Sequence, residues 1–276
     1  MRQTGESLAG RIAYVDLGPF DVIEVGKDES AVTSLWIHGG FPDSYLATDD
    51  EESLAIRKDF IRTYLERDVA MFGPRLPAET LERLWTMLAH NQGTLLNASR
   101  LASSLSISAQ TVTRYIDLLV DMLLVRRLKP YHGNVKKRLV KSPKVYVRDS
   151  GLLHALLGLV DYNALAGHPI IGASWEGFVI ENLIACAPPR NLASFYRTAA
   201  GAEIDLLLEL PGDKRWAIEI KLGSAPRRDK GFHHAREDIQ PDRSFLLYSG
   251  TERYPLSAEI DAIGLKELAQ ELTELN

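Results

Sequence analysis

The sequence predicts a mixed α+β and α/β chain, in which a helical winged helix-turn-helix unit precedes a sheet unit with helices on its faces. Apolar residues recur at helical spacing across residues 52–123, and apolar runs of strand length dominate residues 193–248. With 276 residues, 45% of them hydrophobic, the chain is long enough for two compact cores. We therefore divide it into residues 1–50, which do not resemble an independent domain, a helical unit at 51–160 and a sheet unit at 161–276.

Composition and charge exclude several classes of protein. No run approaches the roughly twenty apolar residues that cross a bilayer, and the polar start, MRQTGES, lacks the pattern of a signal peptide. We therefore expect a cytoplasmic protein without a membrane partner. Cys186 is the only cysteine, which rules out an internal disulfide and a cysteine-based metal site. A net charge of -5 argues against a protein that coats nucleic acid over its whole surface.

Four helices are predicted in the helical unit. Their ranges are 52–72, 81–90, 98–105 and 109–123. Gly73 and Pro74 end the first helix, and Ser108 is placed to cap the last. The third and fourth helices, joined by a tight turn, form the arrangement of a helix-turn-helix.

A helix-turn-helix that binds DNA lays its second helix in the major groove. On that helix an apolar stripe faces inward and leaves Gln110, Thr111 and Arg114 outward as candidate DNA-binding residues. Asp117 and Asp121 continue the outward face and would oppose phosphate. The same geometry also serves protein interaction or a purely structural role, and the sequence leaves these alternatives open.

A basic block without any Asp or Glu follows, from Arg126 to Arg148. Its apolar positions predict the two strands of a wing, at 125–128 and 135–139, around a turn at 132–134. The candidate phosphate contacts on this wing are Lys136, Lys137, Arg138 and Lys141. A solvated charged face is the usual explanation of such a block, and an anionic partner such as DNA is the alternative.

The sheet unit is predicted to begin with a helix at 174–187, capped by Ser174 and with Glu176 in its first turn. Predicted strands follow at 193–197, 203–210, 216–222 and 244–248, with a helix at 229–238 before the last strand. This alternation predicts a mixed sheet that carries helices on its faces.

Two of these strands are predicted to form a hairpin across the turn 211–213. A three-residue loop there pairs Leu210 with Lys214, and counting outward places Asp205 opposite Glu219. By the same count Glu203 opposes Lys221. Period-two alternation puts these four charged residues on one face. The other face is expected to be apolar, with Ile204, Leu206, Ile218 and Ile220.

Two carboxylates that face each other repel, and a bound cation would remove the repulsion. Asp205, Glu219 and the backbone carbonyl of Ile220 offer oxygen ligands suited to Mg²⁺. Lys221 stands one step away, where an ammonium can orient water or stabilise charge on a phosphate. The plain alternative is a solvent-facing strand with ordinary charges, and the helix dipole alone explains Glu176 in a first turn.

A series of motifs runs in order through nearly the whole chain. They are SLAGR (7–11) with LGPF (17–20), GGFP (39–42), YLERDV (64–69), KRLVKSPKVY (137–146), DSGLL (149–153), WE (175–176), and EID (203–205) with IEIK (218–221). In this series the chain resembles bacterial proteins that join an amino-terminal AAA-type ATPase domain to a carboxy-terminal domain of unknown function.

The resemblance implies a restriction-endonuclease-like fold for the last third of the chain. When the metal site of that fold is carried onto this sequence, the candidate catalytic residues are Glu176, Asp205, Glu219 and Lys221. The resemblance also implies that residues 1–50 are a remnant of the ATPase domain. The chain has no G-x-x-x-x-G-K-[ST] phosphate-binding loop, so we expect neither ATP binding nor ATPase activity from it.

The predicted function is that of a DNA-associated protein. Its winged helix would position a duplex, and its nuclease-like module would hydrolyse a phosphodiester with Mg²⁺ as cofactor. The alternative is a non-catalytic interaction or regulatory module, which binds a protein partner such as a separate ATPase domain and no metal.

Overall fold

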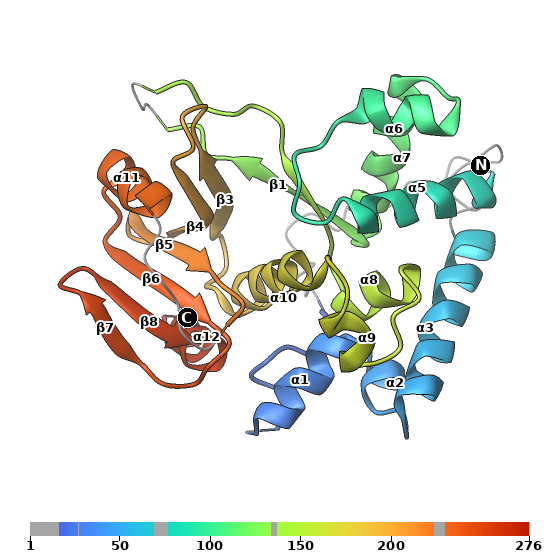
Figure 1. Cartoon of the computed structure of the whole chain (residues 1–276), viewed down its shortest axis with the longest axis horizontal. Helices are drawn as coiled ribbons and strands as arrows, with labels where there is room; N and C mark the ends of the chain where they lie inside the picture. The colour runs from blue at the N-terminus through green and yellow to red at the C-terminus, as the bar shows by residue number, and fades with distance from the viewer. Residues whose placement is uncertain (1–16, 27, 69–76, 134–136, 224–229, 276) are drawn as a thin grey trace, which may run out of the picture.

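The structure, a computed structural model, describes residues 17–26, 28–68, 77–133, 137–223 and 230–275 (Figure 1). Its helices are α1 Glu29–His38, α2 Pro42–Tyr45, α3 Asp50–Thr63, the π-helical turn η1 Tyr64–Asp68, α5 Ala78–His90, α6 Ala98–Leu105, α7 Ala109–Asp121, α8 Ser150–Leu156, α9 Tyr162–Ala166, α10 Ile171–Cys186, α11 Lys230–Ile239 and α12 Leu265–Thr273. Its strands are β1 Val125–Pro130, β2 Lys144–Val147, β3 Leu192–Arg197, β4 Glu203–Leu210, β5 Lys214–Ile220, β6 Arg243–Tyr248, β7 Tyr254–Ser257 and β8 Ile260–Gly264. Across the described ranges, no helix is long and apolar enough to cross a membrane.

The strands form one sheet in the order β2-β1-β3-β4-β5-β6-β8-β7. Parallel pairs such as β5 with β6 stand beside antiparallel pairs such as β4 with β5, which confirms the predicted mixed sheet. Apolar side chains of α10 and α12 pack on one face of the sheet, around Leu206 and Phe245. Those of α11 pack on the other face, around Leu207 and Leu246, and Figure 1 shows α11 at the far side of the sheet from α10.

A second core lies among the helices that precede the sheet. The stripe Leu81, Leu84, Trp85 and Leu88 of α5 is fully buried there, together with Ile116 and Leu119 of α7. The three short helices predicted from periodicity are confirmed within two or three residues at their ends. Ser108 caps α7 as predicted, because its hydroxyl accepts a hydrogen bond from the Thr111 backbone N–H at 3.0 Å.

The second strand of the predicted wing was wrong. β1 pairs antiparallel with β2, Val125 opposite Val147, and not with residues 135–139. Val135 lies outside the described residues, and Leu139 forms an isolated bridge with Thr198 instead. The strand Lys144–Val147 is buried at every position, so pairing there removes more apolar surface from water. The basic residues that precede β2 are therefore not part of the pairing between β1 and β2.

The predicted start of the helix at Ser174 was also wrong. Helix α10 begins at Ile171, so Ser174 lies inside it and caps nothing. Its hydroxyl accepts a hydrogen bond from Trp36 Nε1 at 3.0 Å and contacts His154 Nε2 at 2.7 Å. Glu176 consequently lies in the second turn, where the helix dipole no longer accounts for it.

The first fifty residues contribute helices that periodicity did not predict. Trp36 of α1 packs against Trp175 of α10 with ring centroids 5.1 Å apart, so this segment belongs to the core of the sheet. The predicted helix at 52–72 is present as α3 and η1, and its predicted end at Gly73 and Pro74 lies outside the described residues. The motif SLAGR (7–11) lies outside them as well.

His154 joins α8 to the core through two buried hydrogen bonds. Its Nδ1 donates to the carbonyl of Ile37 at 3.0 Å, which leaves Nε2 to accept from the Ser174 hydroxyl at 2.7 Å. His154 is 1% exposed, and burial lowers its pKa from 6.5 to about 4. The imidazole is therefore neutral in the folded chain at neutral pH.

The neutral state of His154 makes stability depend on pH. In the unfolded chain His154 takes up a proton below about pH 6.5, whereas in the folded chain it does so only below about pH 4. The stability that comes from this difference is therefore fully present above pH 6.5 and falls as the pH drops through this window. We expect a loss of about 2 kcal/mol in the free energy of unfolding between pH 7 and pH 5, measured by urea titration. His154→Gln should remove most of this dependence, whereas His132→Gln, at an exposed position, should keep it. An unchanged pH dependence in His154→Gln would contradict the assignment.

Candidate functional site

A cavity of about 300 Å³ opens where β4 begins and β5 ends. It is lined by Gly93, Lys144, Glu176, Arg197, Gly201, Glu203, Asp205, Glu219, Lys221, Gly231 and Phe232. All four predicted catalytic residues are in this set, contributed by α10, by β4 and by the end of β5. The structure therefore places them around one cavity, and their catalytic roles remain a prediction.

The hairpin register places Asp205 beside β5. The predicted pair Leu210 and Lys214 is confirmed, and the ladder continues to Leu206 and Ile218, one step before Asp205 and Glu219. At that step the Asp205 side chain turns onto the partner strand, where Oδ2 accepts a hydrogen bond from the Ile220 backbone N–H at 2.9 Å. This bond fixes one carboxylate oxygen and leaves the other directed to the cavity.

A β-bulge in β4 changes the predicted faces. Ser194 pairs with Leu207 and Tyr196 with Ile204, so β4 carries one residue more than β3 between these pairs. Ile204 was predicted to share a face with Leu206, but it packs with the α11 core, whereas Leu206 packs with the α10 core. The extra residue breaks the period of two, and Asp205 lies at the break.

Lys144, which the sequence analysis placed in the basic block, lies at the centre of the carboxylates. Its Nζ is 3.0 Å from Glu176 Oε1, 3.0 Å from Glu203 Oε1 and 3.5 Å from Asp205 Oδ1. Burial alone would lower its pKa, but attraction by these three carboxylates raises it above the usual value. Lys144 is therefore a permanently charged ammonium, although it is only 3% exposed.

Strand β2 is held on both edges, which fixes the position of Lys144. On one edge Lys144 is paired with Leu128 of β1. On the other edge the backbone N–H of Gly93 donates to the carbonyl of Val145 at 2.8 Å, and Leu95 forms a bridge with Lys144. The backbone of Lys144 cannot leave the sheet without breaking the hydrogen bonds on one of these edges.

Tyr146, two residues along the same strand, also reaches the cavity. Its hydroxyl donates to Glu176 Oε1 at 2.5 Å, and burial raises the pKa of Tyr146 well above its usual value. Burial and the nearby Asp205 raise the pKa of Glu176, against the opposing effects of Lys144 and Tyr146. The ring packs against Gly177, where an added Cβ would come within 3.2 Å of it, so glycine permits this approach.

The remaining charges of the cavity form two further ion pairs. Lys221 Nζ lies 2.5 Å from Glu219 Oε1, and Arg197 Nε lies 3.5 Å from Glu203 Oε2. The predicted repulsion between Asp205 and Glu219 is thus relieved by the protein's own cations. The signal that could have identified Lys144 and Tyr146 is their spacing of two in a short strand, which puts both on one face.

The candidate DNA-binding residues of α7 differ in their exposure to solvent. Gln110 and Arg114 are exposed, as predicted. Thr111 is half-buried, and its hydroxyl lies 2.8 Å from Ser108 Oγ, so Thr111 takes part in the N-terminal cap of α7. Asp117, expected to oppose phosphate, forms an ion pair with Arg127 at 2.6 Å.

The predicted phosphate contacts lie beside the cavity and not in a wing. The backbone of Arg138 accepts a hydrogen bond from Ala199, and Val140 donates to the carbonyl of Arg197, so this segment follows the turn between β3 and β4. Arg138 and Lys141 are exposed. Lys137 lies 3.6 Å from Asp238, and Lys136 lies outside the described residues.

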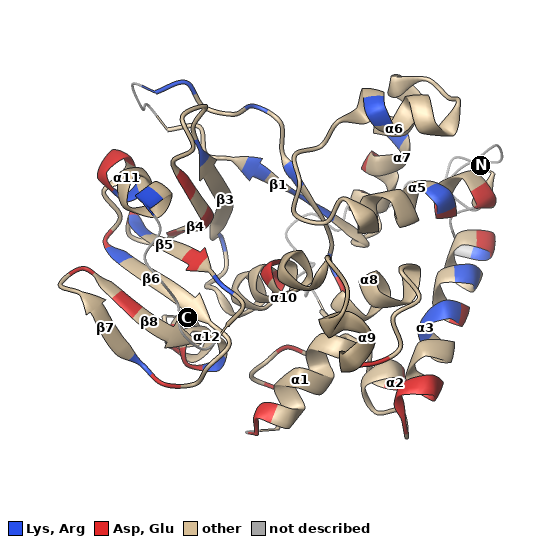
Figure 2. Cartoon of the chain, viewed as in Figure 1, with Lys and Arg blue, Asp and Glu red and all other residues tan. Residues whose placement is uncertain are grey.

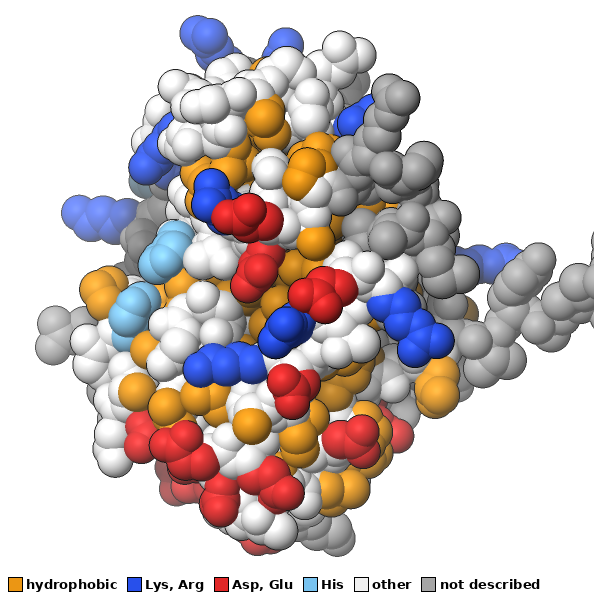
Figure 3. Space-filling model, turned by 90° about the vertical axis from the view of Figure 1, so that its right-hand side faces the viewer, with side chains coloured by type: hydrophobic (Ala, Val, Ile, Leu, Met, Phe, Trp, Pro, Cys, Tyr) orange, Lys and Arg blue, Asp and Glu red, His pale blue; other side chains and the backbone are white. Residues whose placement is uncertain are grey.

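Much of the basic block is neutralised by acids that are distant in sequence. Arg126 and Arg148 both pair with Glu181 of α10, Arg148 at 2.9 Å. Figure 2 shows acidic and basic residues mixed along the chain, and on the face in Figure 3 their side chains are interspersed without one continuous basic field. The run without Asp or Glu in the sequence is therefore not a uniformly positive surface in the fold.

The oxygen donors at the cavity are of the chemical type that Mg²⁺ prefers. Asp205, Glu219 and the carbonyl of Ile220 are hard oxygen donors. Within the described part of the chain, however, no three His, Cys, Asp or Glu side chains stand together as a metal site. The ammonium groups of Lys144 and Lys221 contact the carboxylates instead. A cation at Asp205 would have to share that carboxylate with Lys144.

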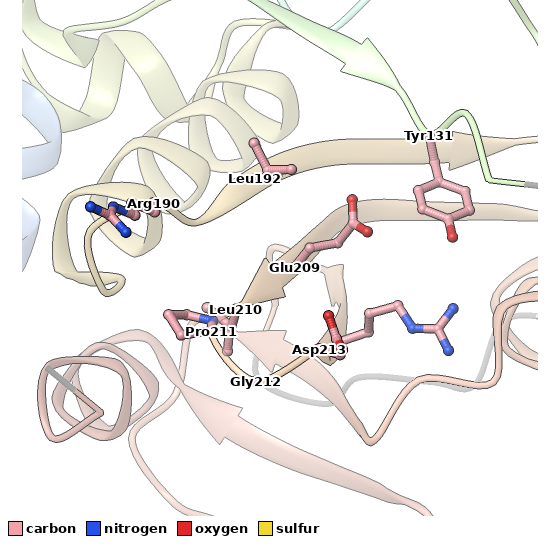
Figure 4. A pocket seen from close by; sticks show the side chains of 9 residues that line it. Tyr131, Arg190, Leu192, Glu209, Leu210, Pro211, Gly212 and Asp213 are labelled. Atoms are coloured by element: carbon pink, nitrogen blue, oxygen red, sulfur yellow. The ribbon is translucent and has the colours of Figure 1, made fainter.

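A second cavity, of about 480 Å³, lies at the other end of the same strands, beside the turn 211–213. Figure 4 shows Arg190 at one side and Tyr131 at the other, with Glu209 between them. Its polar side chains do not converge on one point, so we assign no chemistry to it.

Comparison with known proteins gives two family matches. A family described as "Domain of unknown function (DUF8612)" matches residues 29–163, and one described as "Domain of unknown function (DUF4143)" matches residues 171–268. Uncharacterised proteins of Mycobacterium bovis and Mycobacterium tuberculosis are each similar to this chain, with 46% identity over 258 residues. That alignment covers 94% of this chain and 58% of each mycobacterial protein.

A more distant relative is an uncharacterised protein of Haemophilus influenzae, 27% identical over 166 residues. The alignment covers 55% of this chain and 41% of that protein. No solved structure matches the chain. The chain thus spans only part of the length of the relatives it matches.

Proposed function

We propose that this chain is a DNA-associated protein whose carboxylate cavity hydrolyses phosphodiesters with a divalent cation. The proposal is carried by one observation. Glu176, Asp205 and the pair Glu219 and Lys221 come from three separate elements of the chain, which bring them to one cavity. Buried acids and a lysine that converge on one cavity are typical of catalytic and binding sites.

In this proposal Asp205, Glu219 and the Ile220 carbonyl hold Mg²⁺, which would supply Lewis-acid stabilisation of the phosphate. Lys221 lines the cavity with a side chain that is 39% exposed and an ammonium 2.5 Å from Glu219 Oε1, and in this proposal it contacts a phosphate oxygen. In this proposal Glu176 completes the catalytic set, with its carboxylate held by a hydrogen bond from Tyr146 and by the Lys144 ammonium.

The DNA in this proposal passes over the exposed basic residues at the cavity. Arg138 and Lys141 lie on the segment beside the turn from β3 to β4, within the same region as Arg197. Gln110 and Arg114 of α7 offer a second contact surface on the helical unit. We keep the winged-helix and restriction-endonuclease-like assignments as part of this proposal, together with the link to an AAA-type ATPase domain.

Metal binding is the first test. We expect calorimetry to detect Mg²⁺ or Mn²⁺ binding by the wild-type chain and its loss in Asp205→Asn and Glu219→Gln, which remove an anionic ligand but little volume. Plasmid and branched DNA should be cleaved only with metal, and at least about a hundredfold more slowly by Asp205→Asn. Glu209→Gln is the matched control, because Glu209 lies on the same strand but lines the other cavity. A wild-type chain that binds no divalent cation would remove the nuclease proposal.

DNA binding is tested separately by gel shifts at increasing salt. Reversing Arg138 and Lys141 to Glu should weaken binding and reduce the slope of log affinity against log salt by about 2, because two phosphate contacts are lost. Arg190→Glu, an exposed arginine at the other end of the sheet, should leave the slope unchanged. Equal affinity and slope in the double variant and the control would contradict the proposed DNA path.

The alternative function is a non-catalytic module that binds a protein partner, such as a separate ATPase domain. One observation favours it: Lys144 and Lys221 already neutralise the carboxylates, so the cluster is stable without metal. It predicts no cation binding, together with retention of a protein partner in pull-downs by both the wild-type chain and Asp205→Asn.

A further inference from the structure

Lys144 is a resident cation among the residues to which the proposed function assigns a metal. Its ammonium contacts Glu176, Glu203 and Asp205, and it reaches them from β2, outside both strands of the hairpin. Of these three acids, only Asp205 is a metal ligand in the proposed function. The ammonium thus has one partner that a metal would claim and two that a metal would leave free.

We propose that Lys144 and a divalent cation compete for the carboxylate of Asp205, with Glu203 as the partner that draws Lys144 away when the metal binds. This inference rests on the proposed function, because it requires that the cavity takes a divalent cation. In this inference Lys144 sets the affinity of the cavity for the metal and takes part in no chemical step.

The distances place both cations close together on Asp205. Mg²⁺ binds carboxylate oxygens at about 2 Å, and the Lys144 ammonium is 3.5 Å from Asp205 Oδ1. A Mg²⁺ ion on the same carboxylate would therefore be repelled by the ammonium. Lys144 is 3% exposed, so it cannot relieve the repulsion by moving into bulk solvent.

Glu203 offers the second position that such competition needs. Its Oε1 already lies 3.0 Å from Lys144 Nζ, and its Oε2 is 3.5 Å from Arg197. The ring of Phe195, whose centroid is 5.6 Å from the ammonium, offers a further favourable surface for the charge. A small movement of the flexible stem of Lys144 toward Glu203 would free Asp205 while the charge stays paired.

The competition predicts changes of opposite sign. Lys144→Met removes the competitor and should tighten Mn²⁺ binding by about tenfold or more. Glu203→Gln removes the alternative partner, holds Lys144 on Asp205 and should weaken Mn²⁺ binding. In the double variant the Glu203→Gln change should have a much smaller effect, which separates competition from a general loss of negative charge.

The experiment is Mn²⁺ titration by calorimetry of the full chain, together with melting temperature in chelator and in Mn²⁺. Lys144→Met should melt lower than the wild type in chelator, because three carboxylates lose their shared cation, and Mn²⁺ should restore much of the loss. Lys144→Arg, which keeps the charge, and Lys129→Met, at an exposed position of β1, are the controls. Neither should bind Mn²⁺ more tightly than the wild type.

The two proposals fail in different ways. If neither the wild type nor Lys144→Met binds Mn²⁺, the metal function falls and the competition with it. If the wild type binds Mn²⁺ and Lys144→Met binds it no more tightly, only the competition is overturned. Should Lys144→Met not fold, Glu203→Gln decides alone, and an affinity equal to that of the wild type would overturn the inference. Binding detected only in Lys144→Met would support the competition but would still remove the nuclease proposal for the wild-type chain.

Discussion

The contact of the Lys144 ammonium with three carboxylates is the interaction on which the arrangement of the cavity depends. Glu176, Glu203 and Asp205 come from a helix and a strand that would otherwise carry like charges into one poorly solvated space. Burial of unpaired charge is costly, so these elements can approach only because β2 delivers a cation between them. The position of β2, bound by β1 on one edge and by residues 93–96 on the other, is therefore part of the site.

Helix α10 connects this site to the rest of the core. Glu176 faces the cavity, Gly177 admits the Tyr146 ring, and Ser174 joins the hydrogen bonds of His154 and Trp36. Glu181, one turn further along, pairs with Arg126 and Arg148 at the edge of the sheet. A shift of this helix would disturb the buried network, the ion pairs and the cavity together, which gives the carboxylates a rigid support.

Sequence periodicity was sufficient for features that depend on local patterns. The helices of residues 78–121 and the hairpin register from Leu210 to Leu206 follow from spacing and from a short turn, because each is decided within a few residues. The β2 strand and the bulge at Asp205 were not predictable in this way. Both depend on partners that are remote in sequence, and a basic run such as the one around Lys144 gives no local sign that acids from α10 and β4 will neutralise it.

A crystal of the chain grown with Mn²⁺ would show directly whether Asp205 and Glu219 hold a cation beside Lys144. Anomalous scattering locates the metal without reference to activity. The account predicts a peak within about 2 Å of carboxylate oxygens of Asp205 and Glu219, with Lys144 drawn toward Glu203. An ordered cavity without a peak, with Lys144 still on all three carboxylates, would contradict it.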